Sequence, residues 1–130
     1  NVRLFHLEDP VAYIEDLSDE HRCLILTHDH GLDYDLTLAL LTRTEIDYVG
    51  LIGSATKATR FFDRLRKDGV SVDDIARCCC PVGLSGIKGK LPMEIAVAIA
   101  AQLLSLDPQK ASQIKPDLSW RQIKAAFNPS

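Results

Sequence analysis

The stretch LTHDHGLDYD, residues 26–35, concentrates side chains that can do acid–base or binding chemistry. Two histidines and three aspartates lie within its last eight residues, directly after the apolar run CLIL. Imidazoles and carboxylates at the end of a strand can hold a polar ligand and pass protons. They can equally hydrogen-bond backbone groups and cap the strand. Both interpretations are open, and the candidate residues are Thr27, His28, Asp29, His30 and Asp33.

The same stretch begins like the zinc-binding pattern T-H-x-H-x-D-H of metallo-β-lactamases. That pattern requires Asp and then His where this sequence has Leu32 and Asp33. The remaining histidines are His6 and His21, and a catalytic zinc usually takes three protein ligands. We therefore expect no metal site and no catalytic residues here.

A second candidate site lies at Gly53-Ser54, between an apolar run and a helical pattern. The first N–H groups of a helix, together with its dipole, favour a phosphate. Lys57 falls in the first turn of that helix and adds positive charge. The pattern predicts an anion site at Gly53, Ser54 and Lys57. Ordinary helix capping, with Lys57 in solvent, is the alternative.

Short apolar runs alternate with helical patterns along the chain, which predicts an α/β fold with a mostly parallel sheet. Asp33 or Asp35 is expected to cap the helix that follows the histidines, and Ser54 the next one. The expected strands are 2–7, 23–26, 46–52 and 77–80, and the expected helices are 10–17, 33–43, 54–67, 72–76 and 92–104, with a short final helix near Trp120, Ile123 and Phe127. In such sheets ligands bind outside the carboxyl ends of the strands. We therefore expect residues 27–30, 53–54 and 81–83, including Pro81 and Gly83, to line one edge.

Composition excludes several classes of protein. A length of 130 residues suits one domain, and a net charge of −3 argues against a nucleic-acid binder. No apolar run approaches the roughly 18 residues of a membrane span, and the first residues do not read as an export signal. Cys23 and the run Cys78-Cys79-Cys80 fit neither zinc nor disulfide spacing, so we expect free thiols in the cytoplasm. No G-x-G-x-x-G turn is present, which makes NAD binding by this chain unsupported.

Four motifs together resemble one family. LTHDHGLDYDLTLALL, YVGLIGSATKATRFFDRL, PVGL and LPMEIAVAIAAQLL are similar, in order and interval, to the C-terminal Rossmann-like domain of xanthine dehydrogenase accessory proteins, the XdhC/CoxI family. The resemblance implies a Rossmann-like three-layer sandwich over residues 1–106 that lacks the first strand and its glycine-rich turn. Residues 107–130 would form an extension that packs on this domain or is partly mobile.

The resemblance also implies a function. Family members act as chaperones of purine metabolism that bind molybdenum cofactor (molybdopterin), help its sulfuration and deliver it to xanthine dehydrogenase or a related molybdenum hydroxylase. The implied partners are that enzyme, a cysteine desulfurase and a second copy of the chain, with no nucleic acid and no membrane. The residues carried over as cofactor-binding are Thr27, His28, Asp29, His30, Asp33, Gly53, Ser54, Lys57, Pro81 and Gly83.

Two rival functions stay open on the sequence. The chain could be part of a nucleotide-dependent oxidoreductase whose glycine turn lies outside it. It could also be an interaction module that binds no cofactor, with the apolar helix at 92–104 as part of its interface.

Overall fold

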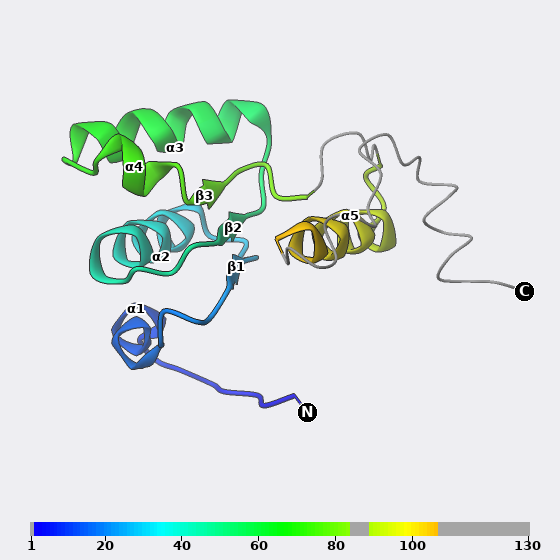
Figure 1. Ribbon diagram of the computed structural model, residues 1–130, viewed down its shortest axis with the longest axis horizontal. Helices are drawn as coiled ribbons and strands as arrows, with labels where there is room; N and C mark the ends of the chain where they lie inside the picture. The colour runs from blue at the N-terminus through cyan, green and yellow to red at the C-terminus, as the bar shows by residue number, and fades with distance from the viewer. Residues whose placement is uncertain (1, 84–88, 107–130) are drawn as a thin grey trace, which may run out of the picture. The chain divides into compact units, whose positions relative to one another are not determined.

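The computed structural model describes residues 2–83 and 89–106 and divides the chain into two compact units, 1–81 and 82–130. The elements of the first unit are α1 (Pro10–Tyr13), a 3-10 turn (Ile14–Asp16), β1 (Cys23–Ile25), α2 (His30–Arg43), β2 (Val49–Leu51), α3 (Ala55–Lys67), α4 (Val72–Ile75) and β3 (Cys78–Cys79) (Figure 1). The second unit contains α5 (Pro92–Ser105).

The three described strands form a parallel sheet in the order β1-β2-β3. Cys23 pairs with Val49 and Val49 pairs with Cys78, so these three residues form one row across the sheet. Each β-α-β connection is a crossover, which parallel strands require. The predicted parallel α/β architecture of Rossmann type is therefore confirmed.

Helices α2 and α3 pack against each other and share one core with the sheet. The Tyr34 ring meets the Phe61 ring edge to face at 5.5 Å, and the Arg64 guanidinium lies 3.8 Å from the Tyr34 ring centroid. The Tyr34 hydroxyl donates to Asp68. Burial, followed by this hydrogen bond, raises the pKa of Tyr34 to about 12. The apolar core of this unit is formed by Ile25, Leu40, Leu41, Ile46, Val49, Leu51, Phe61 and Leu65, with Ile14 and Val70.

The helix caps explain where α2 and α3 begin. The Asp29 carboxylate accepts hydrogen bonds from the N–H groups of Gly31 and Leu32, at 2.9 and 3.1 Å. The prediction that Asp33 or Asp35 caps α2 is therefore wrong, because Asp29, four residues before Asp33, accepts from the free N–H groups. Ser54 caps α3 as predicted, since its hydroxyl accepts from the N–H of Lys57 at 3.2 Å.

Arg77 joins the end of α2 to the start of β3. Its guanidinium donates to the carbonyls of Leu41, Thr44 and Ile46 at 2.6 to 3.1 Å, and to Asp74 at 2.9 Å. A free helix carboxyl terminus leaves carbonyls without partners. Arg77 satisfies one of these and orders the loop that leads into β2.

The remaining predicted elements differ mainly in extent. The strand predicted over residues 46–52 is shorter, at Val49–Leu51, and the strand predicted at residues 77–80 is Cys78–Cys79. No strand is assigned to residues 2–7, where Val2 and Leu4 are almost fully exposed, so that prediction is wrong. Alternating apolar residues form a strand only when a neighbouring strand pairs with them, and no described strand does. The predicted final helix lies outside the described residues.

The second unit centres on α5, which matches its predicted position. Pro92 stands in the first turn, and Glu94 accepts the N–H of Leu91 at 3.4 Å. Val97, Ala98, Ile99 and Ala101 are buried, as expected for a helix that is apolar almost all round. No helix in the described part of the chain is long and apolar enough to cross a membrane.

Candidate functional site

Asp33 is a buried carboxylate at the carboxyl edge of the sheet. Its side chain is fully buried in the first turn of α2, which begins just beyond β1. One carboxylate oxygen, Oδ1, accepts the hydroxyl of Thr27 at 2.6 Å. The Thr27 hydroxyl oxygen in turn accepts the N–H of Asp29 at 3.1 Å. Thr27 thus fixes the turn between β1 and α2 in relation to the buried acid.

Lys57 neutralises Asp33 from the neighbouring turn. Its ammonium lies 2.7 Å from Asp33 Oδ2 and 2.8 Å from the carbonyl of Ile52, and the lysine side chain is only 11% exposed. The β1-α2 and β2-α3 turns are adjacent because parallel strands end at the same edge. A buried carboxylate is tolerated when it is paired and hydrogen-bonded, and both conditions are met here.

Gly53 lets this lysine cross the turn. A Cβ built on Gly53 would lie 2.6 Å from Lys57 Cδ and 3.3 Å from the sulfur of Cys80. Any side chain at position 53 would therefore displace the lysine that pairs with Asp33. The absence of a side chain is required by this close approach, which gives the Gly-Ser turn a specific purpose beyond capping.

The thiol of Cys80 belongs to the same edge, since it follows β3. Burial raises the pKa of the Cys80 thiol, and the nearby Lys57 ammonium opposes that shift. Neither Cys80 nor the Ile52 carbonyl was among the residues predicted for the site. Their position directly after predicted strands was the available signal, but the residue types alone did not single them out.

The amino ends of α2 and α3 differ in what they can bind. At α2 the Asp29 carboxylate already occupies the place where an anion would bind. At α3 the Ser54 cap takes only the N–H of Lys57. The N–H groups of Ala55 and Thr56 have no partner among the described residues, and both residues are exposed. Helix dipole and free donors together make α3 the better anion-binding end.

His28 and His30 flank Asp29, and all three residues are exposed. They are therefore accessible beside the network of Thr27, Asp33 and Lys57, of which Asp33 is buried and the other two are half-buried. In the described ranges, 2–83 and 89–106, no three His, Cys, Asp or Glu side chains gather closely enough to hold a metal ion.

The last two predicted residues fall in different units. Pro81 follows β3 at the end of the first unit and is exposed. Gly83 belongs to the second unit, where its N–H and carbonyl pair with the Gln102 amide at 3.0 and 3.1 Å. Its φ of +114° favours glycine, and an added Cβ would lie 3.1 Å from that of Ala98. Gly83 thus anchors the chain to α5 within its own unit.

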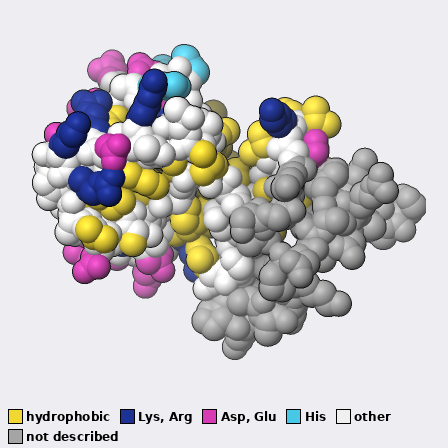
Figure 2. Space-filling model, turned by 90° about the horizontal axis from the view of Figure 1, so that it is seen from above, with side chains coloured by type: hydrophobic (Ala, Val, Ile, Leu, Met, Phe, Trp, Pro, Cys, Tyr) yellow, Lys and Arg dark blue, Asp and Glu magenta, His cyan; other side chains and the backbone are white. Residues whose placement is uncertain are grey.

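Charge on the larger unit is mixed. Figure 2 shows Lys and Arg side chains interspersed with Asp and Glu side chains on the visible face of that unit. Helix α3 carries Arg60, Arg64, Arg66 and Lys67, but also Asp63, which pairs with Arg66. This face has no continuous basic stripe of the kind that nucleic-acid binders present.

A parallel α/β sheet with polar turns gathered at its carboxyl edge is the arrangement of a Rossmann-type ligand-binding domain. Comparison with known proteins gives the family. The model of the XdhC Rossmann domain matches residues 4–103, and the chain belongs to this family.

A curated relative is similar to this chain over nearly the same length as the family match. The uncharacterized protein YqeB of Escherichia coli (strain K12) is 32% identical over 105 residues, which cover 79% of this chain and 19% of YqeB. The chain thus spans about a fifth of the length of this curated relative.

Proposed function

We propose that this domain takes part in the maturation of xanthine dehydrogenase-type molybdoenzymes, as a carrier of molybdenum cofactor and not as a catalyst. The observation that supports this most strongly is the match to the XdhC Rossmann domain over residues 4–103. In this proposal the cofactor is cargo: the domain holds it, assists its sulfuration and passes it on.

The cofactor's phosphate fits the amino end of α3. A phosphate ester carries negative charge and several acceptor oxygens, and the exposed N–H groups of Ala55 and Thr56 are free donors among the described residues. The hydroxyl of Ser54 lies at the same end. Three donors in one turn suit a phosphate group better than any other chemical group on the cofactor.

Lys57 lies in the first turn of α3 and connects it to α2 through Asp33. Its ammonium is engaged by Asp33 and by the carbonyl of Ile52, so the pair carries no net charge and its contribution is to hold the two turns together. Direct contact between Lys57 and the phosphate would require the pair with Asp33 to open. We propose that Thr27, Asp33 and Lys57 position the site, while the turn around Gly53 and Ser54 binds.

The exposed His28, Asp29 and His30 suit the polar edges of the pterin. Imidazole and carboxylate groups can donate to and accept from a pterin's ring nitrogens and exocyclic groups. The pairing assigns the phosphate to α3 and the pterin to the rim of α2, two turns that adjoin through the Asp33 and Lys57 pair.

The partners follow from the same role. We propose xanthine dehydrogenase or a related molybdenum hydroxylase as the recipient, a cysteine desulfurase as the sulfur donor, and a homodimer as the working form. All four cysteines are free thiols, which fits the reducing cytoplasm in which these enzymes would mature.

Cofactor retention tests the proposal. The full chain is produced in cells that make molybdenum cofactor, and its molybdenum and pterin contents are measured after purification. We expect retention by the wild type and at least about a tenfold loss in the double variant His28→Ala/His30→Ala, because two exposed ligand contacts of about 1 kcal/mol each are removed. His6→Ala, also at an exposed histidine, is the matched control and should retain the cofactor. A folded wild-type chain without molybdenum or pterin would contradict the carrier function.

A further inference from the structure

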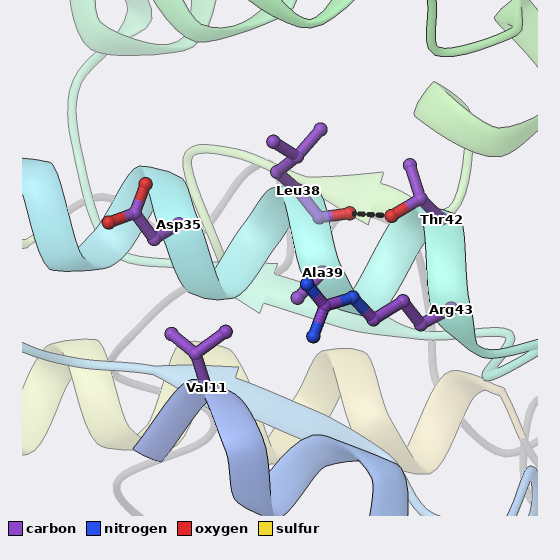
Figure 3. Close-up of a pocket in the computed structure, with 6 residues that line it drawn as sticks. All are labelled: Val11, Asp35, Leu38, Ala39, Thr42 and Arg43. Atoms are coloured by element: carbon purple, nitrogen blue, oxygen red, sulfur yellow. Dashed lines mark hydrogen bonds between the residues drawn. The ribbon is translucent and has the colours of Figure 1, made fainter. Parts of the chain in front are cut away.

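A groove runs along α2 beside α1, apart from the carboxyl edge of the sheet. It has a volume of about 390 Å³ and is lined by Val11, Asp35, Leu38, Ala39, Thr42 and Arg43 (Figure 3). None of the predicted cofactor-binding residues lines it. The groove is therefore a surface that the proposed carrier function does not use.

This groove has an apolar middle and opposite charges at its two ends. Asp35 and Arg43 stand eight residues apart on α2, which is about 12 Å along the helix axis. Figure 3 shows Leu38 of α2 and Val11 of α1 on either side of the space between the two charged residues, and both are half-buried. Ala39 is buried, so it forms the floor and offers almost no contact area.

Both charges are available to a partner. Asp35 is exposed and has no ion-pair partner among the described residues. Arg43 meets only Glu15, at 3.7 Å, and the two side chains are 50% and 71% exposed. An ion pair this exposed contributes little to stability, so a carboxylate of a partner can take the place of Glu15.

We propose that the groove binds an extended segment of a partner protein in which a basic, an apolar and an acidic residue stand at alternate positions. Alternate side chains of an extended chain point to the same side, and its first and fifth residues lie about 13 Å apart. This distance matches the spacing of Asp35 and Arg43 along α2. The third, apolar side chain then lies between Leu38 and Val11.

The size of the groove favours an extended segment over a helix. A helix with its side chains is at least about 10 Å across, so a 12 Å length of it occupies on the order of 900 Å³. This is more than twice the volume of about 390 Å³ that the groove offers. An extended chain needs a width of only about 5 Å, the spacing of neighbouring strands.

The two opposite charges also select the charge pattern of the segment. A segment with charges of one sign would bring like charges together either at Asp35 or at Arg43, and such a contact is unfavourable. A segment with one basic and one acidic end satisfies both residues. Because these charges are exposed, the association should weaken as salt is added.

Three pentapeptides with blocked ends test this pattern by NMR titration of the isotope-labelled full chain. Each has leucine in the middle and threonine on both sides of it, and the end residues are lysine and glutamate, two lysines or two glutamates. We expect the mixed peptide to shift the amide signals of Val11, Asp35 and Arg43. It should bind at least about fivefold more tightly than either like-charged peptide, because each of those meets one like charge in the groove.

Charge reversal in the groove should change the preferred peptide. Asp35→Arg makes both ends basic and should favour the peptide with two glutamates, whereas Arg43→Asp makes both ends acidic and should favour the peptide with two lysines. A new preference also shows that each variant is folded. Asp73→Arg, at an exposed aspartate outside the groove, is the matched control and should keep the preference for the mixed peptide.

Three results would overturn the inference: a mixed peptide that shifts no signal of the groove, a wild type that binds a like-charged peptide as tightly as the mixed one, or reversal variants that keep the wild-type preference. None of these results bears on cofactor retention, so the groove and the carrier function are tested separately.

Discussion

The pair of Asp33 and Lys57 shows how single side chains hold the site together. The acid is fully buried, the lysine is nearly so, and every polar atom of the pair that the structure describes as buried has a partner. Such a pair adds little stability compared with apolar residues of the same size, but breaking it leaves a buried charge without compensation. Its main effect is to fix the geometry of two adjacent turns.

We predict that Lys57→Met lowers the free energy of unfolding by about 3–5 kcal/mol, because the Asp33 carboxylate stays buried without its partner. The double variant Asp33→Asn/Lys57→Met should lose less than the sum of the two single variants, since the charges disappear together. Urea unfolding measures the free energy of unfolding of the two single variants and the double variant. Arg60→Met, at an exposed residue of the same helix, should change the value by no more than about 0.5 kcal/mol. Additive losses would show that Asp33 and Lys57 are not coupled.

At the scale of elements, the connection between α2 and β3 depends on Arg77. Its guanidinium serves three carbonyls and one carboxylate, and its side chain is 16% exposed. The β2 and β3 strands are only three and two residues long, so few ladder hydrogen bonds hold β3 in place. The side-chain hydrogen bonds of Arg77 therefore compensate for the few ladder hydrogen bonds that these short strands can form.

Arg77→Leu should therefore lower the free energy of unfolding by at least about 3 kcal/mol, since three partly buried carbonyls lose their donor. The matched control is Arg66→Leu, because Arg66 is 60% exposed and its ion pair with Asp63 lies on the surface; its expected loss is about 0.5 kcal/mol or less. Equal losses in the two variants would mean that the Arg77 hydrogen bonds add nothing beyond a surface ion pair.

The sequence predicted most of these elements, and the exceptions have local causes. Apolar runs and helical spacing located α2, α3 and α5, because these signals depend on neighbouring residues alone. The cap of α2 was misplaced because Asp29, Asp33 and Asp35 are chemically equivalent in sequence, and only burial distinguishes the cap from the core acid. The strand expected at residues 2–7 needed a partner strand that the described residues do not provide.

The close approach of two of the predicted turns could be expected from the sequence, but the contacts of their side chains could not. The ends of parallel strands meet at one edge, which brought Thr27, Asp33 and the Gly53 turn together as expected. The contact of Lys57 with Asp33 spans 24 residues of sequence, and no local pattern reveals it. The sequence offered Lys57 either as part of an anion site or as a solvent-exposed side chain, whereas its ammonium is paired with Asp33 and its side chain is only 11% exposed.

At the scale of the whole molecule, the carboxyl edge of the sheet is the surface that the proposed function uses. It presents the N–H groups of Ala55 and Thr56, which have no partner among the described residues, and the exposed His28 and His30. The chain spans about a fifth of the length of YqeB, so the activity of a whole relative is not assigned to it. Cofactor binding at the carboxyl edge is the central claim.

The most direct test is the affinity of the purified chain for molybdenum cofactor when Thr56 is replaced by glutamate. An acidic residue in the first turn of a helix stabilises the helix, so Thr56→Glu should fold while repelling a phosphate from the amino end of α3. Thr59→Glu adds the same charge one turn further along α3, at another exposed threonine. We predict that Thr56→Glu weakens cofactor binding at least about tenfold and that Thr59→Glu changes it little. Equal affinity in the wild type and Thr56→Glu would contradict a phosphate site at this helix and with it the account of the carboxyl edge.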